Sequence, residues 1–101
     1  VGGLQMIVNG YGWHKRDKPP TSDQLLETNR DWYNYTIDQF GPERCMFESN
    51  FAVEKLSCSY TVLWNQFKKL TKNFSKDERA AMFHDTAKRV YRLPKVYRRT
   101  F

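Results

Sequence analysis

Apolar residues recur at helical spacing in three stretches of the chain, and the first stretch is the clearest. It begins at Thr21 or Ser22, where Thr21 and Gln24 have the spacing of a capping box. Gly41 followed by Pro42 is typical of a helix stop. We therefore predict a helix that ends at Phe40 and buries one face. The residues expected on that face are Leu25, Leu26, Trp32, Tyr33, Ile37 and Phe40.

Two more helices are predicted towards the end of the chain. One runs from about Ser59 to Lys72, and the next begins at Ser75, whose spacing to Glu78 forms a second capping box. The Leu93-Pro94 pair is expected to end the last helix. Their inward faces are expected to hold Tyr60, Leu63, Trp64, Phe67 and Leu70 in the first, and Met82, Phe83, Ala87, Val90 and Tyr91 in the second.

Two short apolar runs lack a helical period, at about residues 2–8 and 44–48. Neither run alternates with polar residues, which is typical of parallel strands buried on both faces. Strands that alternate with helices favour a parallel sheet, so the order of elements predicts an α/β fold. Two strands are too few for a complete layer, and we therefore expect residues 1–93 to be part of a larger α/β domain.

Charge is concentrated near the C-terminus. The 101 residues have a formal net charge of +6, and residues 68–101 hold eleven basic and three acidic side chains. Residues 94–101 are expected to form a basic tail. Tyrosines lie among these cations, so an alternative function is a small basic module that binds nucleic acid through residues 88–99.

Membrane and secretory signals are not found in this sequence, because no apolar stretch approaches the length of a membrane span and no signal-like segment opens the chain. Two cysteines do not form a disulfide framework, so we expect reduced thiols and a cytoplasmic location. The chain begins with Val1 instead of a methionine, which suggests part of a longer protein.

Candidate chemistry lies in the loops that follow the two predicted strands. In parallel α/β folds these loops share one rim, where ligands bind. The first loop carries Trp13 and His14, and His14 could ligate a metal or transfer protons. The second loop carries Glu48, a carboxylate at the end of an apolar run that is either paired with a cation or functional.

The segment from Phe40 to Phe51, which reads FGPERCMFESNF, resembles a C-terminal signature of the amidohydrolase-related (type 2) family of TIM-barrel, metal-dependent hydrolases. The family pattern is roughly Phe-Gly-x-x-Arg-x-Met-Phe-Gly-Ser-Asp-Trp-Pro. Residues 83–93 and 1–4 are similar to its closing helix and to an earlier strand. The resemblance implies a partial TIM barrel made of the last two βα units and C-terminal helices. It also implies water attack on an amide, lactone or similar carbonyl bond.

The resemblance also implies the site residues and partners. The family's last-strand Asp, which binds a divalent metal such as zinc, corresponds to Asn50, and an amide is a poorer ligand that cannot take a proton near neutral pH. Asn50 and Glu48 are the expected catalytic residues, with Trp13 and His14 at the substrate entrance. The expected partners are a small-molecule substrate and the rest of the barrel, not a membrane or nucleic acid. Because the family's His-x-His pair is missing, we expect no hydrolysis by these residues alone.

Overall fold

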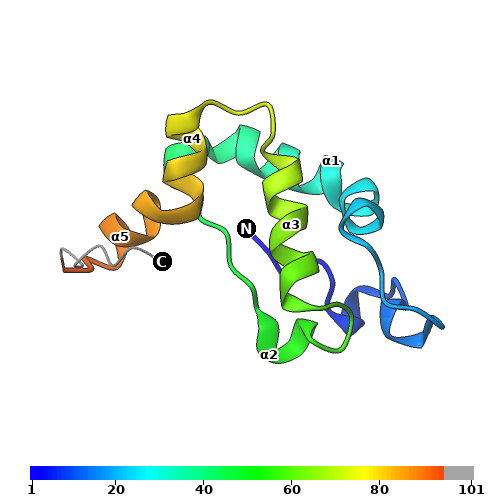
Figure 1. Cartoon of the computed structure of the whole chain (residues 1–101). Coiled ribbons are helices and arrows are strands. Elements are labelled where there is room, and N and C mark those ends of the chain that lie inside the picture. Colours follow the sequence, from blue (N-terminus) through cyan, green and yellow to red (C-terminus); the bar gives the residue numbers. More distant parts are fainter. Residues whose placement is uncertain (95–101) are drawn as a thin grey trace.

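The computed structural model describes residues 1–94, and these residues form a helical assembly (Figure 1). The two longest helices are α1 (Ser22–Phe40) and α3 (Tyr60–Leu70), which pack against each other. Short elements connect them: 3₁₀ turns at η1 (Ile7–Asn9), η2 (Trp13–Lys15) and η3 (Pro42–Arg44), and one turn of α-helix at α2 (Phe51–Glu54). None of the helices in the described range is long and apolar enough to cross a membrane.

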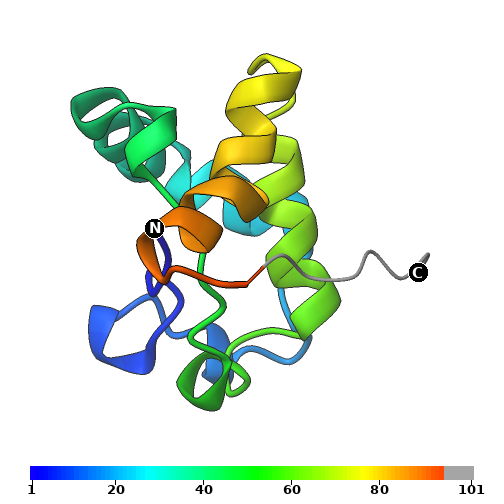
Figure 2. The ribbon, with the colours of Figure 1, turned by 90° about the vertical axis from the view of Figure 1, so that its left-hand side faces the viewer.

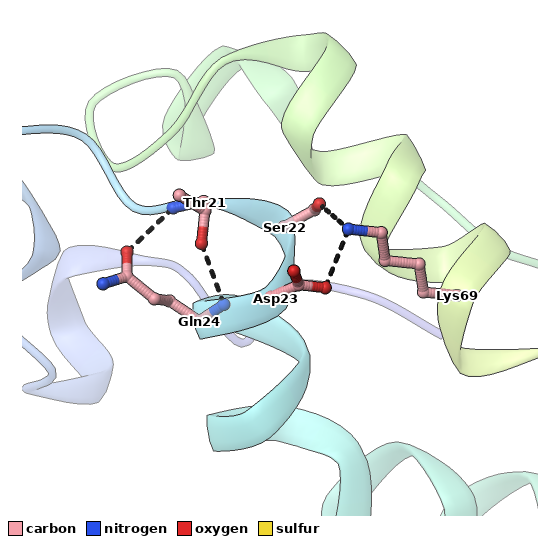
Figure 3. Close-up of polar contacts among 5 residues, drawn as sticks. All are labelled: Thr21, Ser22, Asp23, Gln24 and Lys69. Atoms are coloured by element: carbon pink, nitrogen blue, oxygen red, sulfur yellow. Dashed lines mark hydrogen bonds and ion pairs between the residues drawn. The ribbon is translucent and has the colours of Figure 1, made fainter.

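The predicted start and end of α1 are confirmed. The backbone N–H of Gln24 donates to Thr21 Oγ1 at 3.2 Å, and Thr21 N–H donates to Gln24 Oε1 at 2.9 Å, so the capping box is complete (Figure 3). At the other end, Gly41 has a φ of 84° and donates its N–H to Ile37 O at 2.7 Å. Both ends are therefore set by residues within a few positions of each other.

One ion pair joins the first turn of α1 to the last turn of α3. Lys69 Nζ lies 2.7 Å from both Ser22 Oγ and Asp23 Oδ1 (Figure 3). The Asp23 side chain is largely exposed, so solvent screens the pair and its contribution to stability is small.

The predicted C-terminal helix is also confirmed, as a continuous run of three elements. α4 (Lys76–Ala80) begins with the Ser75–Glu78 capping box, η4 (Ala81–Asp85) is a turn of π-helix, and α5 (Thr86–Val90) completes the run. Figure 2 shows the run as successive coils, coloured from yellow to orange. Met82, within the π-helical turn, is almost completely buried.

The predicted α/β fold with a partial TIM barrel is wrong for this structure: residues 1–94 contain no β-strand. Residues 2–8 are irregular up to η1, and residues 45–50 belong to no helix or strand. Pairing between the two segments is limited to Val1, whose ammonium group donates to Met46 O at 2.7 Å and whose carbonyl accepts from Glu48 N–H at 3.0 Å.

Two causes prevent longer pairing. Gly3, with a φ of 88°, turns the first segment away directly after Val1 and Gly2. The N–H of Phe47 donates to Met82 O in the π-helical turn, at 3.0 Å, instead of to a strand. A strand needs a row of backbone partners along an edge, and here each segment finds only isolated ones.

The core is built around the aromatic ring of Phe67 on α3. This ring stacks on Phe47 with ring centroids 4.4 Å apart, and it makes edge contacts with Tyr33 at 5.6 Å and Trp64 at 5.3 Å. The inward faces predicted from the sequence are confirmed for most positions. They are wrong for five residues whose side chains are more than half exposed: Trp32, Phe40, Tyr60, Val90 and Tyr91.

Candidate functional site

Glu48 and Asn50 lie on the extended segment that passes beside Gly2 and Gly3. A Cβ atom on Gly2 would come within 2.6 Å of Glu48 O and 2.7 Å of Glu48 Cγ, so this close approach requires glycine. A Cβ built on Gly3 would lie 4.0 Å from both Glu48 Oε1 and Asn50 Nδ2. The carboxylate and the amide predicted as catalytic therefore border the same residue.

The backbone of Asn50 begins α2 in a left-handed conformation, with φ 46° and ψ 35°. Asparagine tolerates this conformation better than most residues do. Its carbonyl accepts hydrogen bonds from the N–H groups of Val53 at 3.1 Å and Glu54 at 3.0 Å, while its side chain makes no capping bond. The half-buried amide can thus donate to one group and accept from another, but it cannot transfer a proton near neutral pH.

Trp13 and His14 line a cavity of about 510 Å³ together with residues that follow Asn50 in the chain. These are Phe51 and the run of residues 55–59. Trp13 is buried, and the Arg16 guanidinium lies 4.1 Å from the centroid of its ring. The structure therefore brings the Trp13–His14 pair to the segment that carries α2. Neither Glu48 nor Asn50 lines this cavity.

A buried polar network, which sequence reasoning missed, fixes the position of α2. Glu54 is fully buried, and its carboxylate accepts from Gln5 Nε2 at 2.8 Å and from Gln5 N–H at 3.3 Å. Asn29 Nδ2 donates to Gln5 Oε1 and, at 2.8 Å, to Gln66 Oε1. The network joins the N-terminal segment to α1, α2 and α3, so it holds the Asn50 turn and the Gly3 turn in place.

Burial raises the pKa of Glu54 above its usual value, and the hydrogen bonds from Gln5 partly oppose this effect. Burial also raises the pKa of the neighbouring Cys58 thiol to about 11, and the negative charge of Glu54 adds to the shift. No sequence signal identified this network, because its members are single polar residues up to 61 positions apart in the chain.

The metal-binding role predicted for Asn50 does not fit the residues of the described range alone. No group of three or more His, Cys, Asp or Glu side chains in residues 1–94 could hold a metal ion. Beside Gly3 lie one carboxylate oxygen of Glu48 and the amide nitrogen of Asn50, while His14 lines the separate cavity. An amide nitrogen is not a metal ligand, and one carboxylate falls short of the three protein ligands typical of catalytic zinc sites.

The basic region predicted as an alternative nucleic-acid interface is only partly described. Its residues 95–99 lie outside the described range. Within that range, Arg89 donates from Nη2 to the backbone carbonyl of Glu43, and the Thr86 hydroxyl donates to the same carbonyl at 3.1 Å. At least one cation of this region therefore anchors α5 to the turn at η3.

Comparison with known proteins gives a family match. The sequence profile of a family described as amidohydrolase matches residues 10–93. A curated protein from Sinorhizobium fredii (strain NBRC 101917 / NGR234), named uncharacterized protein y4mH, is 49% identical over 67 residues. That match covers 66% of this chain and 23% of the relative, so the chain spans only part of the relative's length. No solved structure matches.

Proposed function

The chain belongs to the amidohydrolase family, and from this membership we propose that it forms the C-terminal part of an enzyme that hydrolyses a small molecule. The bond attacked by water is an amide, lactone or similar carbonyl bond. The observation that supports the proposal is that the side chains of Glu48 and Asn50 both lie beside the glycine turn at Gly3.

The two side chains have complementary roles in this proposal. Glu48 is exposed and ionisable, so it can accept a proton from the attacking water as a general base. Asn50 is half-buried and oriented by its backbone turn, so its amide can hold the water or the carbonyl oxygen by hydrogen bonds. Trp13 and His14 bind the substrate portion away from the reacting carbonyl.

The remaining part of the site comes from the rest of a family-length enzyme. Most of the length of the S. fredii relative has no counterpart in the matched segment of this chain. A divalent metal such as zinc, where one is used, would take most of its ligands from that remaining part. The isolated chain is therefore proposed to be inactive. A cytoplasmic location accords with the two free thiols, Cys45 and Cys58.

A chimera tests these roles. The S. fredii relative is made with the corresponding segment of this chain in place of its own, and both proteins are assayed with a panel of amides and lactones. The chimera should hydrolyse what the relative hydrolyses, and residues 1–101 alone should not. In the chimera, Asn50→Ala should lower kcat/KM by about tenfold or more, through loss of one oriented hydrogen bond at the reacting centre.

The matched control is Asn73→Ala, at an exposed asparagine between α3 and α4. It should leave kcat/KM unchanged. Equal rates for the Asn50→Ala chimera and the unsubstituted chimera would remove Asn50 from the site. Unchanged turnover in Glu48→Gln would likewise exclude Glu48 as the base.

A further inference from the structure

The cavity beside Trp13 has more cationic than anionic groups. Arg16 and Lys55 line it from two separate segments of the chain, together with His14 and a single carboxylate, Asp17. Within the described residues, Lys69 pairs with Asp23 and the His84 ring contacts Asp85, and neither Arg16 nor Lys55 forms a salt bridge with a carboxylate of residues 1–94.

The positive end of a helix faces the same cavity. Ser59, the N-cap residue of α3, lines the cavity, and α3 has no acidic side chain in its first turn. The Ser59 hydroxyl accepts from Val62 N–H at 3.2 Å, which leaves the first N–H groups of the helix without a side-chain acceptor from this cap. The partial positive charge of such a terminus favours an anion nearby.

Trp13 helps to hold the Arg16 side chain at the cavity. Trp13 lines the cavity although it is only 4% exposed, and its indole nitrogen is buried. The Arg16 guanidinium lies 4.1 Å from the centroid of the Trp13 ring. A guanidinium that stacks by its flat face keeps its edge N–H donors free, and these donors match the two oxygens of a carboxylate.

Apolar side chains form another part of the wall. Phe51 and Leu56 line the cavity, and Leu56 is more than half exposed. A volume of about 510 Å³ exceeds what an inorganic ion needs and lies within the usual range for small-molecule sites. The combination of a cationic end and an apolar wall fits an organic anion better than free phosphate.

We propose that this cavity binds the carboxylate of a small organic acid, with the carboxylate between Arg16 and Lys55 and the apolar part against Phe51 and Leu56. The inference rests on the proposed function, because it makes the enzyme's substrate a carboxylate-bearing molecule. It assigns recognition of that charge to Arg16 and Lys55, apart from the reacting groups at Glu48 and Asn50.

Binding to the 101-residue chain is measured by titration at constant ionic strength, with tryptophan fluorescence and the NMR signal of the Trp13 indole N–H as readouts. The probes are benzoate, its neutral analogue benzamide, and inorganic phosphate. Benzoate should bind saturably and at least tenfold more tightly than either other probe. Arg16→Gln and Lys55→Gln should each weaken benzoate binding by about tenfold, because each removes a charge-assisted contact.

The matched controls are Lys15→Gln and Lys18→Gln, which remove a cation from the same loop but not from the cavity wall. Both should keep the affinity for benzoate. All four positions are exposed, so circular dichroism should show an unchanged fold for each variant. Equal binding of benzoate and phosphate, equal losses in the control variants, or no saturable binding of benzoate would each overturn the proposal.

The chimera separates this inference from the proposed function. If benzoate binds as described but Asn50→Ala leaves turnover intact, the carboxylate site stands and the catalytic roles fail. If Asn50→Ala abolishes turnover while Arg16→Gln and Lys55→Gln leave the preference for carboxylate-bearing over neutral substrates unchanged, the catalytic roles stand and the carboxylate site is refuted.

Discussion

Replacing Phe67 with alanine should remove a large part of the stability of the chain. Phe67 has no exposed surface, and its ring contacts Phe47, Tyr33 and Trp64 from three different directions. These residues come from α1, α3 and the extended segment that leads to Asn50. The loss of this one ring would therefore loosen the contacts that join the site segment to both long helices.

The size of the stability loss follows from the apolar area that the Phe67 ring buries and from the cavity that its removal leaves. Truncating a buried aromatic ring to a methyl group removes roughly 100–150 Å² of apolar burial, worth about 2.5–4 kcal/mol at about 25 cal/mol per Å². The cavity left behind raises the cost, so we expect a loss of about 3–5 kcal/mol. Small domains have about 5–15 kcal/mol of stability in total, so this single change removes a large fraction.

Urea denaturation followed by circular dichroism measures the loss as a shift of the midpoint at constant slope. Phe67→Leu, which keeps most of the volume, should cost clearly less than Phe67→Ala. Trp32→Ala deletes a larger side chain that is 63% exposed, and it should cost less than about 1 kcal/mol. A loss below 1 kcal/mol for Phe67→Ala, or equal losses for Phe67→Ala and Trp32→Ala, would refute the packing described above.

Three further predictions concern local features. Thr21→Ala removes the N-cap of α1 and should lower the free energy of unfolding by about 1 kcal/mol in urea, whereas an unchanged midpoint would show that the capping box contributes nothing. Because burial raises the pKa of Glu54 above its ordinary 4.5, the unfolded chain loses this proton at a lower pH than the folded chain does. Stability should therefore fall as the pH rises from about 4.5 towards the raised pKa, and Glu54→Gln should remove that part of the decline in urea midpoints measured from pH 4 to 8. A decline identical in both proteins would contradict this assignment. The buried Cys58 thiol, whose pKa burial raises to about 11, should not react with a thiol reagent such as DTNB at pH 8 until urea unfolds the chain, and rapid labelling of the folded protein would disprove its burial.

The helices were predictable because their signals are local. The capping boxes at Thr21 and Ser75 and the stop at Gly41 involve residues no more than four positions apart, and each appears in the structure as expected. The sequence predicted less well which apolar residues of each helix are buried. Trp32 and Phe40 continue the helical period of α1, but no described element covers them, so periodicity alone overestimated the width of the buried face.

The sequence predicted individual residues of the candidate site, but not which of them lie close together. The pattern around Asn50 resembled a family signature, and the family match over residues 10–93 confirms that resemblance. The proximity of Glu48 and Asn50 to Gly3 depends on contacts between residues more than forty positions apart. The cavity that joins Trp13 to the residues after α2 likewise depends on tertiary packing, as does the network around Glu54.

The sequence by itself determined α1, α3, the start of the C-terminal helical run and the family, because these follow from short-range spacing and from a contiguous motif. The tertiary structure decided the state of the two apolar segments at 2–8 and 44–48. A strand exists only when backbone partners line its edge, and the two segments meet each other only through Val1. It also decided which polar side chains became buried, since Gln5 and Glu54 complete each other's hydrogen bonds only after the chain has folded.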